Sequence, residues 1–89
     1  MVNQKDGGII KQVDESVEVA RQHIIDSVAV RNMKARKVET MTNLMQAIIG
    51  QITMFTADPR MIKKRIENLM ERGFMKRDEE DNKKLIYIP

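Results

Sequence analysis

The chain has 89 residues and a mass of 10.3 kDa, which predicts one small domain near the lower size at which a single hydrophobic core is stable. It contains no cysteine, and this excludes disulfides, thiolate zinc sites and a thiol nucleophile. With 16 Lys and Arg against 13 Asp and Glu, the net charge is +3, so the surface should attract acidic partners only mildly.

The first residues of the chain differ in character from the rest. Residues 1–12 are polar, include Gly7 and Gly8, and show no sustained hydrophobic period. We therefore expect a flexible lead-in at 1–12 and one folded domain at 13–89. No apolar run is long enough to span a membrane, and no charged-then-apolar leader opens the chain. We expect a soluble, intracellular protein that does not enter a membrane.

A first helix is predicted from Asp14 to about Lys37, a stretch without Gly or Pro. Spacings of three and four residues set up an apolar stripe, formed by Val13, Val17, Ala20, Ile24 and Val28. Arg31 then falls on this stripe, while Val30 and Met33 lie on other faces. The last two turns are therefore expected to face something different or to leave the core.

A second, shorter helix should follow, because Val38, Thr40 and Thr42 interrupt the first one and either threonine could cap the next. Its apolar residues recur at helical spacing, and they are Met41, Leu44, Met45, Ile48 and Ile52.

The third helix has the clearest boundaries. Asp58 is a natural N-cap, Pro59 suits the first helical position, and Gly73 stands where a left-handed residue ends a helix. Phe74 should pack back on Leu69, as is usual at such an end. The expected buried face consists of Ile62, Ile66, Leu69 and Met70, and the methionines expected to fill the core are Met41, Met45, Met61 and Met70.

Two short extended segments complete the pattern. Residues 74–77 and 84–88 flank an acidic turn at 78–82 and are typical of a β-hairpin. The predicted fold is mostly α within the α+β class: a winged helix-turn-helix of three helices followed by a two-stranded hairpin wing.

Three blocks in this order resemble the C-terminal winged-helix (neddylation) domain of cullins. Residues 29–37, Ala-Val-Arg-Asn-Met-Lys-Ala-Arg-Lys, are similar to the family's Ile-Val-Arg-Ile-Met-Lys-x-Arg-Lys segment. Residues 61–77 resemble its third helix and first wing strand, and Leu85–Pro89 its Tyr-x-Tyr-x-Ala ending. The chain departs from the family at Ala29, Asn32 and Pro89.

The resemblance implies that the chain belongs to the scaffold of a multi-subunit ubiquitin ligase, and that Lys34 receives a ubiquitin-like modifier through an isopeptide bond. It implies a RING subunit, a neddylation conjugating enzyme and its co-ligase as partners, in the cytoplasm and nucleus. Modification in the family frees this domain and the RING subunit, which raises ubiquitin transfer. The domain would then be a substrate with no catalytic residue, cofactor or metal.

The residues around Lys34 fit this role. Helical geometry places Lys34 in line with His23 and Ser27, off the apolar stripe, so its side chain should be at least partly exposed. Aminolysis needs a neutral amine, whereas an ordinary lysine is protonated at neutral pH, so activation should come mostly from the conjugating enzyme. Arg31, Arg36 and Lys37 carry charge beside the acceptor and are candidates for docking an acidic patch of that machinery.

A DNA-binding winged-helix regulator is the alternative. The third helix offers cations to phosphates or base edges, namely Arg60, Lys63, Lys64, Arg65 and Arg72. Against this, Asp78, Glu79, Glu80 and Asp81 in the wing turn would meet the phosphate backbone at an electrostatic cost. An enzyme is a poorer choice, because His23 has no companion metal ligand or nucleophile and the acidic turn lacks calcium-loop spacing.

Overall fold

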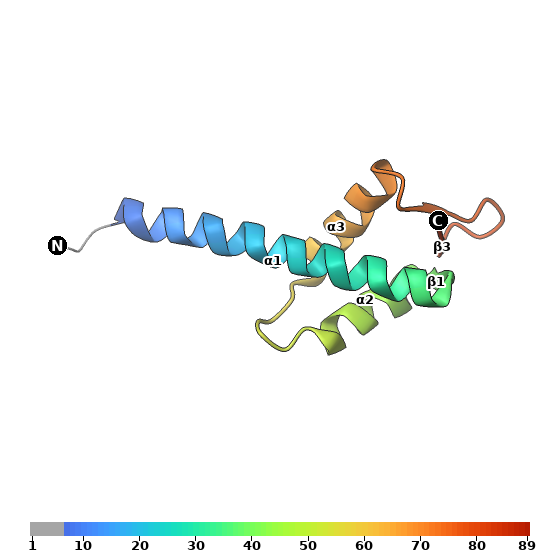
Figure 1. Ribbon diagram of the computed structural model, residues 1–89, viewed down its shortest axis with the longest axis horizontal. Helices are drawn as coiled ribbons and strands as arrows, with labels where there is room; N and C mark the ends of the chain where they lie inside the picture. Colours follow the sequence, from blue (N-terminus) through green and yellow to red (C-terminus); the bar gives the residue numbers. More distant parts are fainter. Residues whose placement is uncertain (1–6) are drawn as a thin grey trace.

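The computed structural model describes the backbone of residues 7–89 and the side chains of residues 17–89. Its elements are, in chain order, α1 (Gly7–Arg36), β1 (Val38–Thr40), α2 (Met41–Gln51), α3 (Pro59–Glu71), β2 (Met75–Arg77) and β3 (Lys84–Tyr87). The C-terminal half of α1 lies against α2 and α3, and the strands gather at the end of this half (Figure 1). The predicted winged-helix order of three helices and a hairpin is therefore confirmed.

The predicted start of the first helix is wrong, because α1 begins at Gly7 and not at Asp14. Residues 7–12 of the expected lead-in thus have a helical backbone, and residues 1–6 lie outside the described part of the chain. A glycine costs a helix only about 1 kcal/mol relative to alanine, so Gly7 and Gly8 do not prevent it from forming. The other end agrees with the prediction: Lys37, at φ 73°, is left-handed and stops the helix.

The buried face of α1 also differs from the predicted stripe. The buried residues are Ile25, Val28, Ala29, Asn32 and Met33. Of the two alternatives expected for the last two turns, departure from the core is therefore wrong, and these turns stay in the core through another face, that of Asn32 and Met33. Of the predicted stripe only Val28 is buried; Val17 and Ala20 are exposed, and Val13 lies outside the residues whose side chains are described. Ile24 is partly buried and packs against the core, whereas the exposed Val17 and Ala20 lie nearer the N-terminal part of α1, which extends past α2 and α3 (Figure 1).

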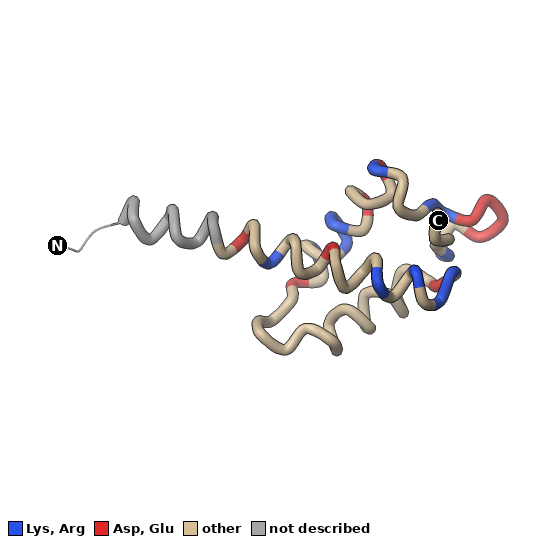
Figure 2. Tube along the Cα trace, viewed as in Figure 1, with Lys and Arg blue, Asp and Glu red and all other residues tan. Residues whose placement is uncertain are grey.

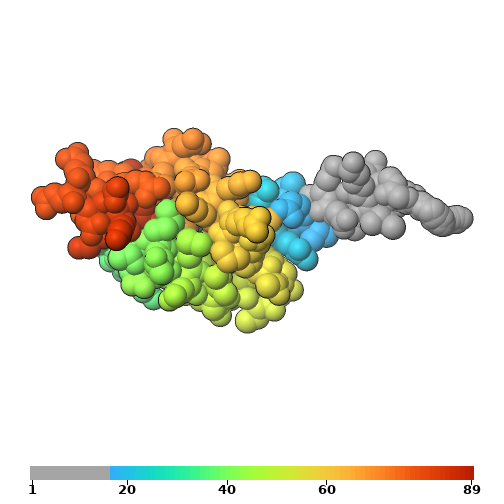
Figure 3. Space-filling view, turned by 180° about the vertical axis from the view of Figure 1, so that it is seen from behind, coloured from blue at the N-terminus to red at the C-terminus, as the bar shows by residue number. Residues whose placement is uncertain are grey.

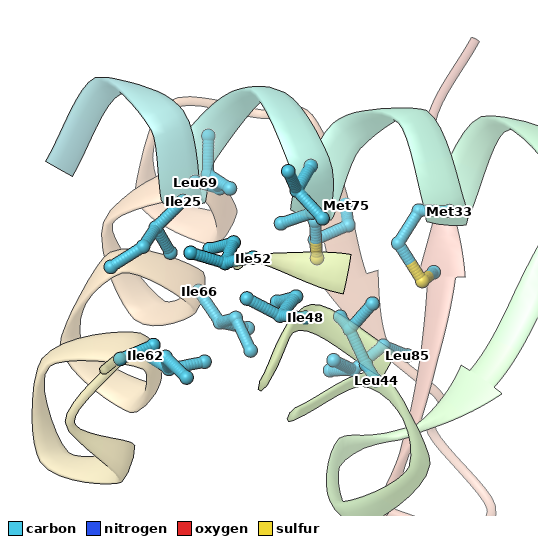
Figure 4. Packing of buried hydrophobic residues seen from close by; sticks show 13 residues of the cluster. Ile25, Met33, Leu44, Ile48, Ile52, Ile62, Ile66, Leu69, Met75 and Leu85 are labelled. Atoms are coloured by element: carbon cyan, nitrogen blue, oxygen red, sulfur yellow. The ribbon is translucent and has the colours of Figure 1, made fainter. Parts of the chain in front are cut away.

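The core is formed where the three helices meet the sheet (Figure 4). The second and third helices contribute the predicted residues, and Leu44, Ile48, Ile52, Ile62, Ile66 and Leu69 are all buried. Met75 and Leu85 close the core from the strands. The four methionines predicted as core filler, Met41, Met45, Met61 and Met70, are partly buried and pack against this cluster.

The sheet has one strand more than the predicted hairpin. Its order is β1-β3-β2 with both pairings antiparallel, so β3 is the central strand. The hairpin of β2 and β3 is confirmed, whereas β1 was not predicted because three residues are too few to show alternation. The Tyr87 N–H donates to the Lys37 carbonyl at 2.8 Å. This bond and the β1–β3 pairing fasten the end of α1 to the sheet.

Helix ends follow the predicted signals. The Thr40 hydroxyl accepts from the Asn43 N–H at the start of α2, and the Asp58 carboxylate accepts from the Arg60 N–H at the start of α3. At the end of α3, Gly73 has φ 85°. The Phe74 N–H donates to the Leu69 carbonyl at 3.0 Å and the Gly73 N–H to the Met70 carbonyl at 3.1 Å, which together form a Schellman motif.

Candidate functional site

Lys34 lies in the last turn of α1 with its side chain exposed. Met33 and Asn32 just before it are buried, so the helix is anchored on the face opposite Lys34. Within the described residues, Lys34 takes part in none of the ion pairs. The position therefore presents a solvent-accessible amine on a rigid element, which agrees with the exposure predicted from helical geometry.

A shallow groove runs along α1 beside Lys34. His23, Ser27 and Lys34 line it together, as their predicted alignment on one helix face requires, and Arg31 lies at its side. The opposite wall comes from the end of α3 and includes Leu69, Arg72 and Phe74. No local pattern predicts this wall, apart from the expected return of Phe74 towards Leu69, because the two sides are far apart in the chain.

The three cations predicted to dock the modifying machinery have different surroundings. Arg31 lines the groove with Lys34 and reaches Gln51 Oε1 only weakly, at 3.4 Å. Arg36 is paired with Glu39 at 2.6 Å. The Lys37 amine lies 5.3 Å from the centroid of the Tyr87 ring. The structure thus brings only Arg31 into the groove, and whether any of the three docks a partner stays a prediction.

Glu39 organises the segment that follows Lys34. Its carboxylate accepts hydrogen bonds from the Arg36 guanidinium, from the Thr40 N–H and from the Asn43 side-chain amide. These donors, the guanidinium foremost, hold the pKa of the Glu39 carboxyl below its usual range. The link joins the last turn of α1, β1 and the first turn of α2.

An ion pair fixes the two walls of the groove relative to each other. Asp26 of α1 accepts from Arg65 of α3 through two parallel bonds of 2.9 and 2.7 Å. This bidentate contact raises the pKa of the Arg65 guanidinium. Arg72 lies 3.6 Å from the same carboxylate and 5.1 Å from the Phe74 ring centroid. No local pattern signals this pair, because its partners are separated by 39 positions.

The inner face of α1 carries a second polar link that the sequence did not predict. Asn32 is 7% exposed, and its amide forms a reciprocal pair with Gln51, the last residue of α2, through bonds of 3.0 and 2.9 Å. Asn32 Nδ2 also donates to the Val28 carbonyl at 2.8 Å. Asn32, which stands where the family has an apolar residue, thus finds a hydrogen-bond partner on α2 for its buried amide.

Other kinds of site find little support in the described part of the chain. Within residues 17–89, no group of three or more His, Cys, Asp and Glu side chains is arranged to hold a metal ion. His23 is exposed. None of the described helices combines the length and apolar character that crossing a membrane requires.

The cations predicted to contact DNA do not form one free surface. Arg60, Lys63 and Lys64 are exposed, but Arg65 is bonded to Asp26 and Arg72 is shared between Asp26 and Asn68. The acidic residues 78–81 follow one another at the tip of the hairpin (Figure 2), where a wing would approach the phosphate backbone.

Comparison with known families gives a direct match. Residues 20–81 match the model of the cullin protein neddylation domain. Similar proteins include Cullin-3 of Dictyostelium discoideum, 38% identical over 88% of this chain and 10% of its own length. Cullin-3B of Arabidopsis thaliana is 40% identical over 88% of this chain and 11% of its length. Cullin-4 of Caenorhabditis elegans is 40% identical over 88% of this chain and 9% of its own length. The chain thus spans about a tenth of the length of these relatives.

A solved structure shares the fold. It belongs to a complex described as Dcn1(P)-Cdc53(WHB), in a dual E3 mechanism for Rub1 ligation to Cdc53. The similarity has a TM-score of 0.83 with 22% identity and covers 99% of this chain and 100% of the other. At that identity the match supports the fold alone. These comparisons, like the geometry of α3, do not favour the DNA-binding alternative.

Proposed function

The chain belongs to the cullin family, as its neddylation domain, and from this premise we propose that Lys34 is the acceptor of a ubiquitin-like modifier. The observation that carries the proposal is the exposed Lys34 amine, which forms no ion pair within residues 17–89, on a helix whose opposite face is anchored in the core. Its motif matches the family's modification segment at the residues Val30, Arg31, Met33, Arg36 and Lys37.

The reaction at this amine is an aminolysis. The Lys34 ammonium first loses a proton, and the neutral nitrogen attacks the thioester carbonyl between the modifier's C-terminal glycine and the conjugating enzyme's cysteine. An isopeptide bond forms, the nitrogen loses a second proton, and the cysteine leaves as a thiolate. Both protons pass to solvent. This domain supplies position: the core and the Asp26–Arg65 pair hold the part of the α1 backbone that carries Lys34. In this proposal the catalysis is left to the conjugating enzyme.

The wider role follows from the family. We place the domain in the scaffold of a multi-subunit ubiquitin ligase of the cytoplasm and nucleus, beside a RING subunit, with the conjugating enzyme and its co-ligase as transient partners. Attachment of the modifier to Lys34 would free this domain and the RING subunit and raise ubiquitin transfer. This role is supported by the family of the chain and by the exposed position of Lys34 on α1.

A reconstituted conjugation assay tests the acceptor. It contains this chain, the modifier, its activating and conjugating enzymes and the RING subunit. Wild type should gain one modifier, and Lys34→Arg should gain none. Lys37→Arg is the matched control, since it changes the same residue type three positions along the chain, and it should be modified at the wild-type rate. Modification of Lys34→Arg with loss in Lys37→Arg would move the acceptor to Lys37.

The docking role of the flanking cations needs a variant that leaves Glu39 in place. Arg36→Gln removes the positive charge, and Glu39 keeps its bonds from the Thr40 N–H and the Asn43 side-chain amide. If the machinery docks on this positive charge, Arg36→Gln slows conjugation several-fold in a domain that a melting curve shows to be folded. Arg31→Glu tests the groove side in the same way. Unchanged rates in both variants would remove the docking hypothesis.

A further inference from the structure

A second surface pocket lies away from Lys34, where the start of α2, the side of α3 and the hairpin meet. These three regions adjoin on the face seen in Figure 3. The polar residues that line the pocket are Thr40, Thr42, Lys63, Arg77, Asn82 and Lys83. It shares no residue with the groove beside Lys34, so a ligand here would not occupy the acceptor groove.

The charge of this pocket is one-sided. Lys63 comes from α3, Arg77 from β2 and Lys83 from the hairpin turn, and none of the lining residues is acidic. The ion pairs formed among residues 17–89 use Arg36, Arg65 and Arg72, so the three pocket cations have no carboxylate partner in the described part of the chain. Three elements thus bring like charges to one opening, which an anion would stabilise.

Several donors of the pocket are already oriented. Arg77 donates from Nη1 to the Asn82 carbonyl at 3.0 Å, which holds the guanidinium at the pocket and leaves its other N–H groups free. The Thr40 hydroxyl accepts from the Asn43 N–H at 3.1 Å, so its own proton remains available to donate. Guanidinium, ammonium and hydroxyl donors around one opening are the groups that bind phosphate oxygens.

The neighbouring acidic turn limits the size of the anion. Asp78 and Asp81 accept from the N–H groups of Glu80 and Lys83, so these carboxylates stay at the hairpin tip beside the pocket. Together with Glu79 and Glu80 they would repel an extended polyanion such as a nucleic acid. A compact group that enters only the pocket avoids most of this repulsion.

We propose that this pocket binds a single phosphomonoester group, with Lys63, Arg77 and Lys83 as its cations and Thr40 and Thr42 as hydroxyl donors. The group could be carried by a phosphorylated side chain of another protein or by a small free phosphate compound, because both present the same dianion. The site shares no residue with the groove beside Lys34 and would add a phosphate-dependent contact to the domain.

The test is a titration of the chain with inorganic phosphate, followed by amide NMR at constant ionic strength, with chloride as the reference anion. Saturable shifts should appear at Thr42, Asn82 and Lys83. Lys63→Gln should weaken binding about fivefold, the effect of losing one exposed charge pair. Lys64→Gln is the matched control: it removes the same charge from the adjacent exposed position of α3 and should leave the affinity within about twofold.

A second series identifies the source of the phosphate. A short phosphoserine peptide is compared with inorganic phosphate and with its unphosphorylated form. Binding of the phosphopeptide at least about tenfold tighter than phosphate would indicate a protein partner, and equal or weaker binding would indicate a small free compound. The proposal is overturned if phosphate causes no saturable shift, or if both lysine variants lose the same affinity. Lys34→Arg should bind phosphate like wild type, so failure here leaves the acceptor assignment unaffected.

Discussion

Replacing Gln51 by alanine removes both hydrogen bonds of the Asn32–Gln51 amide pair, together with the weak, exposed 3.4 Å bond from Arg31. The bonds of the amide pair are 2.9 and 3.0 Å long and partly buried, and each such bond contributes about 0.5–1.5 kcal/mol net. In Gln51→Ala the Asn32 oxygen loses its partner in a site only 7% exposed, while Nδ2 keeps the Val28 carbonyl. We expect the free energy of unfolding to fall by about 1–2 kcal/mol.

Replacing the other partner, Asn32, should have a smaller effect on stability, because Gln51 is exposed. In Asn32→Leu the Gln51 amide can bond to water, and an apolar side chain of similar size enters the core. This change should therefore alter stability by less than about 1 kcal/mol. In the Asn32→Leu background, Gln51→Ala should cost almost nothing, so the double-mutant cycle should give a coupling energy of about 1 kcal/mol or more.

Urea denaturation measures these differences. For a small domain the dependence of unfolding free energy on urea is about 1 kcal/mol per molar, so the midpoint of Gln51→Ala should fall by about 1–2 M. The reasoning is refuted if Gln51→Ala costs the same in both backgrounds. Such a result would mean that the amide pair contributes nothing and that Gln51 acts only through its helix position.

Further predictions concern two glycines and two ion pairs. Gly73→Ala should lower the free energy of unfolding by about 1–2 kcal/mol: Gly73 has φ 85° and an added Cβ meets nothing within 4 Å, so the cost is backbone strain. Gly50 is equally open but helical, so Gly50→Ala should raise the free energy of unfolding by about 0.5–1 kcal/mol in the same urea assay. Asp26→Asn should cost about 1.5–3 kcal/mol, since it weakens the bidentate bonds from a partly buried Arg65; a thermal shift near zero would contradict this. The fold lowers the pKa of Glu39 from 4.5, so the ionised carboxylate stabilises the fold above pH 4.5, and this stabilisation is lost as the pH falls through the lower pKa of the folded state. Glu39→Gln should therefore reduce the loss of unfolding free energy at acid pH, and an unchanged loss would exclude the contribution of Glu39.

Elements with strong local signals could be predicted from the sequence. The bounds of the third helix were predicted correctly because its end signals are local. Asp58 accepts from the Arg60 N–H and Pro59 occupies the first position of the helix, and Gly73 adopts a positive φ after its end. The buried face of α1 could not be placed in this way. Hydrophobic periodicity identifies an apolar face, but the neighbouring elements decide which part of the helix is buried. For that reason Val17, expected to be buried, is exposed, and Met33, expected off the apolar stripe, is buried.

The candidate site shows the same division. Exposure of Lys34 and its alignment with His23 and Ser27 follow from helical geometry alone. The opposite wall of the groove and the Asp26–Arg65 pair depend on how α3 packs against α1. The hydrogen bond of Asn32 to Gln51 could not be predicted either, because the partner lies on α2, 19 positions away in the chain.

The central position of β3 has a consequence for the order in which the domain can form. β3 is synthesised after both of the strands that it joins, so β1 has no partner until residues 84–87 have left the ribosome. A nascent chain that stops before β3 carries the helix of Lys34 without the Lys37–Tyr87 bond and without a sheet. The sheet can therefore close only after residues 84–87 have been synthesised, and a modification enzyme that requires the sheet-bound end of α1 would act only after that point.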